Sequence, residues 1–286
     1  MFSKVLKYDI KAVGRLWWIL AAVSVWFSVI GALALRFIIV TIDSVDNDSF
    51  LISLMMIGAF LLLVGSMIVI LSSPVLSQLI VYYRYYRNFF TDEGYLTFTL
   101  PVSRKKLLLA KSVNAFVWTV LTVVLVIACF CLFFMLGLPS AYLYDFYAEA
   151  FTGILEAFAF AFENMDVWNW IYIVESLLAG LAYMIFGISL VHYSILTGAV
   201  VAKKYKLLAG IGIYYLANMI VSFIIQTVIF IGSAIIEGIS YDLSNYTVTA
   251  VIHVIGSTVM LLGAVALAFI MYLMTQRKLE RKLNLD

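Results

Sequence analysis

Charged residues are scarce in this chain of 286 residues, and their scarcity excludes an ordinary water-soluble domain. Only 12% of the residues are charged, whereas 65% are hydrophobic; soluble domains carry roughly 25% charged residues. A chain of this length cannot hide so much apolar surface in a core surrounded by water. The apolar runs are continuous and do not alternate with polar residues, so they predict membrane-spanning helices and not barrel strands.

The sequence also lacks the motifs of common enzyme and metal sites. It contains neither a G-x-x-x-x-G-K-[ST] phosphate loop nor an H-E-x-x-H zinc motif. Cys129 and Cys131 are two positions apart and do not share a helix face, so we expect no disulfide or metal site between them. His192 and His253 each stand alone in an apolar run. We interpret each as a helix-packing residue or as part of a pathway lining, and we expect no enzyme activity and no bound cofactor.

The apolar runs predict an all-α membrane protein, a bundle of six transmembrane helices forming a single domain over residues 1–286. Pro74 is expected to kink the second span. Residues 1–16 are predicted to form an amphipathic helix along the headgroups, or else a simple basic tail. Residues 138–166 are expected to form one or two short helices at the outer face. The spans are predicted at about residues 17–40, 50–81, 112–136, 168–201, 207–236 and 247–274.

Basic residues gather on one side of this predicted topology. Every Lys and Arg except Arg36 falls in the N-terminal segment, in residues 82–111, in the loop after the fourth span or at the C-terminus. The opposite loops carry Asp and Glu but no Lys or Arg. The positive-inside rule therefore predicts that both termini are cytoplasmic, and the even number of spans agrees.

Charged side chains are rare within the predicted spans, which contain one acid, Glu175, and one basic residue, Arg36. A charge in the middle of a bilayer costs roughly 2.5–3.5 kcal/mol on insertion scales, so we expect Arg36 and Glu175 to snorkel, to pair or to face a cavity. One hypothesis is that they pair with each other, within one chain or across a dimer; the alternative is that both reach the outer headgroups. The intramembrane candidates are Arg36, Glu175, His192, Gln226 and His253.

Glycines seven residues apart recur in several spans. Two helical turns separate the members of each pair, so both lie on one face, where small residues allow helices to approach closely. They predict tight packing within the bundle or a seam between two copies. The pairs are Gly58 and Gly65, Gly180 and Gly187, and Gly256 and Gly263.

Residues 82–111 form the most unusual polar stretch. We expect "YYRYYRNFFTDEG" to extend the second span to a stop at Gly94, and Ser103 to cap a new helix. The predicted result is a helix–turn–helix connection whose apolar side chains are exposed to water, a pattern that usually marks a partner surface. These side chains are Phe89, Phe90, Tyr95, Leu96 and Phe98. The alternative is that the connection folds back onto its own span ends.

"FFTDEGYLTFTLPVSRKKLLLAK", residues 89–111, resembles the cytoplasmic segment between the second and third spans of ABC-2-type permeases from Gram-positive bacteria. In that family a stretch close to D-E-G-Y-L-T-F-T-L-P precedes a basic cluster, and the segment between the second and third spans includes a coupling helix that docks in a groove of a separate ATPase. The resemblance implies that Asp92 and Glu93 make polar contacts and that Phe89, Phe90 and Tyr95 are apolar anchors. The implied contact residues are Asn88, Phe89, Phe90, Thr91, Asp92, Glu93, Gly94, Tyr95, Leu96 and Thr97.

The same resemblance implies the rest of the functional expectation. The chain would be a multi-pass permease in a bacterial cell membrane, paired with a second copy or a sister permease, with ATP and Mg bound by the partner ATPase and no nucleic acid involved. Export of a drug, an antimicrobial peptide or a lipid-like molecule is implied. Two other readings of the residues remain open: a membrane scaffold or regulatory subunit without an ATPase, and an ion-coupled secondary transporter.

Overall fold

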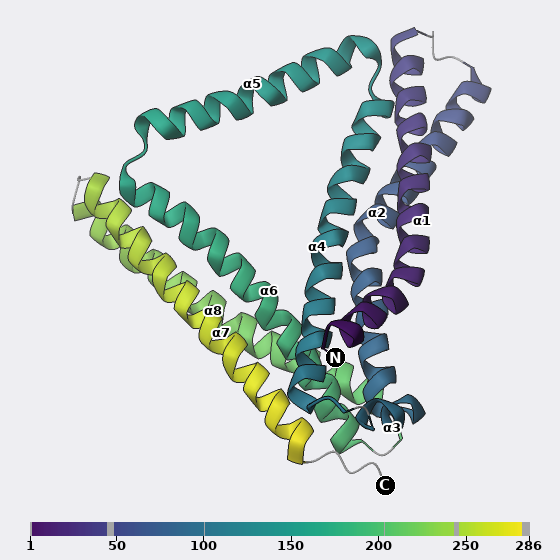
Figure 1. Ribbon diagram of the computed structural model, residues 1–286. Helices are drawn as coiled ribbons and strands as arrows, with labels where there is room; N and C mark the ends of the chain where they lie inside the picture. The colour runs from purple at the N-terminus through teal and green to yellow at the C-terminus, as the bar shows by residue number, and fades with distance from the viewer. Residues whose placement is uncertain (1, 45–48, 100, 203, 243–245, 282–286) are drawn as a thin grey trace. The chain divides into compact units, whose positions relative to one another are not determined.

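The computed structural model describes residues 2–44, 49–99, 101–202, 204–242 and 246–281. Within these ranges it has eight helices and no strands. Six of the helices, α1, α2, α4, α6, α7 and α8, are long and apolar enough to cross a membrane (Figure 1), so the chain is a multi-pass, all-helical membrane protein. The helices are α1 (Phe2–Ser44), α2 (Phe50–Phe90), α3 (Asp92–Phe98), α4 (Arg104–Gly137), α5 (Ser140–Asn164), α6 (Val167–Val201), α7 (Lys206–Asp242) and α8 (Tyr246–Arg281).

The predicted order of six apolar helices is confirmed, with three differences in their limits. Residues 2–16 do not form a separate helix, because α1 continues unbroken from Phe2 through the first span. Gly94 does not stop the second span, since α2 ends at Phe90 and Gly94 lies inside α3. The predicted outer segment is a single helix of 25 residues, α5.

The contacts divide the chain into two compact units. The first unit contains residues 1–5, 84–116 and 160–286, and the second contains residues 6–83 and 117–159. The first unit therefore holds α6, α7 and α8 together with α3 and the adjoining ends of α2 and α4. The second unit holds most of α1 and α2, the remainder of α4 and most of α5.

A buried hydrogen-bond cluster joins the three long helices of the second unit. The Thr122 hydroxyl of α4 donates to the Trp118 carbonyl (2.7 Å) and accepts from Trp17 Nε1 of α1 (2.9 Å). Its third contact is with the Ser77 hydroxyl of α2, at 2.7 Å. A hydroxyl has one hydrogen, and Thr122 uses it on Trp118, so Ser77 must be the donor. The Thr122 oxygen thus accepts hydrogen bonds from both neighbouring helices while its hydrogen stays within α4.

Pro74 lies inside α2 without ending the helix. Proline has no N–H, so the Ile70 carbonyl one turn earlier loses its usual helical partner. The hydroxyl of Ser73 donates to this carbonyl at 2.7 Å. A neighbouring side chain therefore satisfies the acceptor that Pro74 leaves open, which is how transmembrane helices commonly tolerate proline.

In the first unit, α6 lies between α7 and α8 and packs against both. The three helices run side by side in Figure 1. Phe186 and Leu190 of α6 form a buried cluster with Ala268 of α8. Where α6 meets α7 the backbones touch, because a Cβ on Gly198 would lie 2.2 Å from the amide nitrogen of Gly210.

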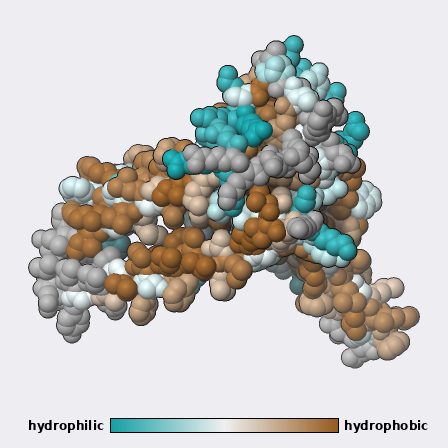
Figure 2. All heavy atoms as spheres, turned by 90° about the horizontal axis from the view of Figure 1, so that it is seen from below, coloured by the Kyte–Doolittle hydropathy of each residue, from teal (hydrophilic) through white to brown (hydrophobic). Residues whose placement is uncertain are grey.

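The glycine pairs predicted to pack helices together make no close contact with another helix in the described part of the chain. A Cβ added to any of the six would meet no atom within 4 Å among the described residues. Their use as a seam between copies stays a prediction. Hydrophobic side chains cover most of the surface visible in Figure 2, and hydrophilic ones gather in patches, which suits a chain whose surroundings are lipid.

We predict that Gly198→Ala destabilises the protein and that Gly187→Ala, on the same helix, does not. The methyl group at residue 198 would overlap the backbone of Gly210, and overpacking of this kind costs about 1–3 kcal/mol. Residue 187 has open space, and alanine is the better helix former. Thermal unfolding of the purified protein should show a lower midpoint only for Gly198→Ala. Equal midpoints for the two variants would contradict the backbone contact.

Candidate functional site

The α2–α4 connection, residues 84–111, lies within the first unit and is the segment that carries the sequence resemblance. α2 ends at Phe90, and the amide of Gly94 donates to the Thr91 carbonyl at 2.7 Å to begin the short helix α3. A Cβ on Gly94 would lie 2.8 Å from the Phe89 carbonyl oxygen. Glycine is therefore needed here for close approach, since it lets α3 fold back against the end of α2.

The start of α4 agrees with the sequence prediction. Ser103 directly precedes the helix, and its carbonyl accepts the first helical hydrogen bond, from the Leu107 amide at 3.1 Å. The exposed side chain of Ser103 stands at the N-cap position. The connection between α2 and α4 therefore turns between two long helices, as expected. Gly94, however, lies in the short helix α3 and not in an extended α2.

A charged network holds α3 to the two long helices. Glu93 forms ion pairs with Arg84, at 3.6 Å, and with Arg87, both on α2. With its amide nitrogen turned toward Glu93, Asn88 donates to Glu93 Oε2 (3.0 Å) and its oxygen accepts from Lys111 Nζ (2.5 Å). Lys111 is buried on α4. Glu93 is thus linked, through Asn88, to the helix on the far side of the connection.

Aromatic rings fill the inner side of the α2–α4 connection. Phe89 has no exposed surface and stacks on Phe98 of α3, with ring centroids 5.5 Å apart. It also packs edge to face with Tyr85, at 4.9 Å, and carries the Lys111 ammonium over its ring at 5.8 Å. The contact with Lys111 is a cation–π interaction, which helps to compensate for burying the charge.

Some of the predicted ATPase-contact residues are buried in this aromatic packing, and others lie on its outer surface. Phe89 was expected to be exposed to water, and this is wrong, because its ring closes the inner side; Asn88 is also buried, at 8% exposure. Phe90, Glu93 and Thr97 are partly buried and Thr91 is exposed. The side chains of Asp92, Tyr95 and Leu96 lie outside the described part of the structure. Any direct contact with a partner must therefore use the outer residues.

Three contacts tie the α2–α4 connection to α6 and α8. His192 of α6 is buried against the Tyr85 ring, with centroids 4.2 Å apart, and its Nδ1 lies 3.4 Å from the Ser112 hydroxyl of α4. Arg104 donates to the carbonyls of Leu279 (2.9 Å) and Glu280 (3.2 Å) in the last turn of α8. Arg104 therefore stabilises carbonyls that lack partners within the helix and complements the negative end of its dipole.

A further contact joins α6 to α8 in the same region. Lys278 of α8 donates to the Thr197 hydroxyl of α6 at 2.8 Å and lies over the Tyr193 ring at 4.7 Å. Together with the bonds from Arg104, this contact joins the ends of four long helices around α3.

Glu175 makes a separate polar cluster with α8. Its Oε1 accepts from the Thr258 hydroxyl (2.8 Å) and its Oε2 from the Ser257 hydroxyl (2.5 Å). Ser257 and His253 also line a cavity of about 740 Å³ between α6, α7 and α8. Two hydroxyls thus replace part of the hydration that the carboxyl group loses in a membrane.

The other intramembrane candidates do not join this cluster. Gln226 is exposed on α7, and Arg36 is exposed on α1 in the second unit. The pairing of Arg36 with Glu175 stays a prediction, because the two residues belong to different units. Cys129 is buried and Cys131 exposed, as expected for residues on different helix faces. Among the described residues, no group of three His, Cys, Asp or Glu side chains could hold a metal ion.

The roles of Arg104, Lys111 and His192 in this region were not foreseen from the sequence in detail. Arg104 and Lys111 were assigned only to a basic cluster, and His192 only to helix packing or a pathway lining. Their spacing gives a partial signal: positions 104 and 111 are two helical turns apart and so share a face of α4. The partners of His192 and Arg104 lie about 80 and 175 residues away in the chain, and no local pattern reveals them.

Comparison with known proteins adds no relative. No protein-family model, no curated protein and no solved structure matches this chain.

We predict that Tyr85→Phe leaves stability unchanged or raises it, whereas Tyr85→Ala lowers it. The Tyr85 hydroxyl is buried and has no hydrogen-bond partner among the described residues, and an unpaired buried polar group costs about 1–3 kcal/mol. Removing the ring would leave a cavity beside Phe89 and His192 and cost about 3–5 kcal/mol. Thermal unfolding of both variants tests this. A clear loss of stability in Tyr85→Phe would show that the hydroxyl is bonded after all.

Proposed function

We propose that this chain is the transmembrane permease subunit of an ATP-driven exporter of the ABC-2 type, energised by a separate ATPase chain. The observation that carries the proposal is the short helix α3, held by Glu93 between two long apolar helices, in the segment whose sequence resembles the coupling segment of those permeases. The alternatives are a scaffold or regulatory subunit and an ion-coupled transporter.

The contacts around α3 suit the transmission of force. Glu93 joins α3 to α2 through Arg84 and Arg87, and Phe98 joins it to α4 through the Arg104 guanidinium, 5.3 Å from the ring centroid. Arg104 in turn bonds to the end of α8. In the proposed mechanism, nucleotide binding draws the ATPases together and shifts α3, and these contacts pass the shift to the long helices. Such coupling requires that the ATPase contacts α3 differently in its two states.

In this proposal the partner ATPase chain binds ATP and Mg. The permease contributes the membrane pathway, with a second copy or a sister permease, and its basic ends face the cytoplasm. The proposed cargo is a drug, an antimicrobial peptide or a lipid-like molecule. The proposed location is a bacterial cell membrane.

We predict that Glu93→Ala reduces recovery of an ATPase with the tagged protein from native membranes by about five-fold or more, equivalent to about 1 kcal/mol of association energy. Loss of Glu93 removes the ion pairs that hold α3 against α2. The control is Glu156→Ala, which removes an exposed acid on α5. The measurement is quantitative mass spectrometry of the co-purified proteins, normalised to the amount of tagged chain.

The same co-purification and a transport assay together separate the proposed function from its alternatives. A scaffold would bring down another cytoplasmic protein and no ATPase. Transport by reconstituted vesicles that needs an ion gradient, and continues without ATP, would support an ion-coupled transporter. Either result would contradict the proposal.

We predict that Ser103→Cys is protected from an impermeant maleimide in intact cells and that Ser140→Cys is labelled. Both serines are exposed, at the start of α4 and at the start of α5. The side of the membrane on which each engineered thiol lies therefore decides whether the maleimide labels it. Cys129 and Cys131 are first replaced by Ala, since Cys131 is exposed. Labelling in opened cells confirms that both engineered thiols react. The reverse pattern in intact cells would invert the orientation and remove α3 from the reach of a cytoplasmic ATPase.

A further inference from the structure

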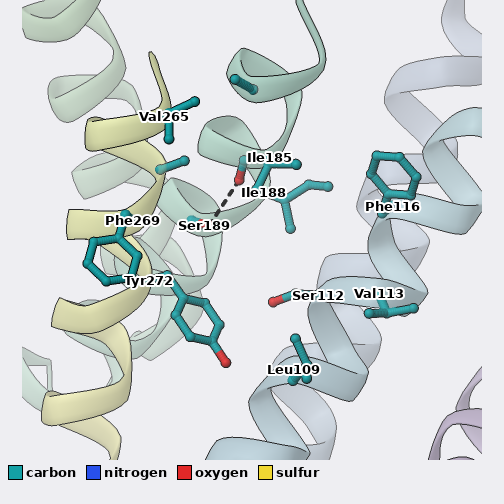
Figure 3. Close-up of a pocket in the computed structure, with 12 residues that line it drawn as sticks. Leu109, Ser112, Val113, Phe116, Ile185, Ile188, Ser189, Val265, Phe269 and Tyr272 are labelled. Carbon is teal, nitrogen blue, oxygen red and sulfur yellow. Dashed lines mark hydrogen bonds between the residues drawn. The ribbon is translucent and has the colours of Figure 1, made fainter. Parts of the chain in front are cut away.

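An apolar cavity of about 540 Å³ lies in the first unit, between the beginning of α4 and the facing parts of α6 and α8 (Figure 3). Its volume lies within the roughly 300–1,000 Å³ of small-molecule sites. Leu109 and Phe116 of α4, Ile185 and Ile188 of α6 and Phe269 of α8 form most of its wall. A wall of this composition offers a ligand apolar contact and almost no hydrogen bonding.

The few hydroxyls in the wall are mostly engaged. Ser189 donates to the Ile185 carbonyl of its own helix at 2.9 Å, the bond drawn in Figure 3. The Ser112 hydroxyl lies against His192. The side chain of Tyr272 points into the cavity, and its hydroxyl is directed toward the end at which Leu109 lies (Figure 3). Tyr272 therefore gives that end of the cavity a polar group.

Lysine side chains stand at this same end. Lys105 lies four residues before Leu109, seven before Ser112 and eleven before Phe116, so all four share one face of α4. Lys106 is next to it in the chain. Both lysines are exposed, and neither forms a hydrogen bond or an ion pair with the described residues. The stripe along α4 thus changes from cationic to apolar over one helical turn.

We infer that this cavity binds one acyl chain of an anionic phospholipid, with the lipid phosphate held by Lys105 and Lys106. The apolar wall matches the acyl chain. The lysines, one turn beyond it, supply the opposite charge at the depth where a headgroup lies; basic clusters beside transmembrane helices recognise anionic lipids in this way. Tyr272 lies near the boundary between the two, where an aromatic ring with a hydroxyl is favoured. This inference does not rest on the proposed export function.

The test measures binding of single lipids to the purified full-length protein by native mass spectrometry. The probes are phosphatidylglycerol and phosphatidylcholine with identical acyl chains, each added in a titration. We expect the first phosphatidylglycerol to bind at least five-fold more tightly than the first phosphatidylcholine. Lys105→Gln should weaken phosphatidylglycerol binding by about five-fold, the effect of one lysine at a membrane surface, with little effect on phosphatidylcholine.

Matched variants separate this site from general attraction to a basic protein. Lys7→Gln removes another exposed lysine, from α1, and should change neither affinity. Val265→Trp places a large ring in the cavity from α8 and should weaken binding of both lipids, whereas Ile270→Trp, exposed on the same helix and outside the cavity wall, should not. Equal affinities of the native protein for the two lipids, or equal effects of Lys105→Gln and Lys7→Gln, would overturn the headgroup assignment. Unchanged binding in Val265→Trp would overturn the cavity assignment.

Discussion

Helices in a bilayer gain little from burying apolar side chains against one another, because the lipid is equally apolar. Their association depends on close backbone approach and on hydrogen bonds between buried polar groups. Both units of this chain use these two means. In the second unit the Thr122 hydroxyl joins three helices, and in the first unit the backbones of α6 and α7 touch at Gly198 and Gly210.

The same constraint shapes the α2–α4 connection. Lys111 and Asn88 are buried there, and a buried charge is costly unless it is compensated. The Asn88 oxygen, the Phe89 ring and the chain of contacts leading to Glu93 provide that compensation. Loss of any one member leaves a polar group without its partner in a region of low dielectric. These contacts join α3 to the ends of both α2 and α4.

Sequence alone was sufficient for the large features and insufficient for the contacts. Long apolar runs fix the six spans, because the bilayer leaves the backbone few alternatives to a helix. The limits of α3 were missed because Gly94 was read as a helix stop, whereas its physical role is the close approach to the Phe89 carbonyl. Phe89 was placed in water because an aromatic in a polar stretch was counted as exposed. Its actual partners, Phe98 and Lys111, lie on two different helices, and a local pattern does not show which rings will meet.

The first turns of α4 have two faces with different chemistry. Arg104 and Lys111 lie on the face that meets α3, α2 and the end of α8, whereas Lys105, Leu109 and Ser112 lie on the face that lines the cavity. Because the two faces belong to one rigid helix, a rotation of α4 driven from α3 would move the cavity wall against α6 and α8. Ser112 and His192 lie where the two faces adjoin. A lipid in the cavity would then favour the orientation of α4 in which the cavity fits the lipid better. This difference in fit is the physical condition for coupling between the cavity and α3.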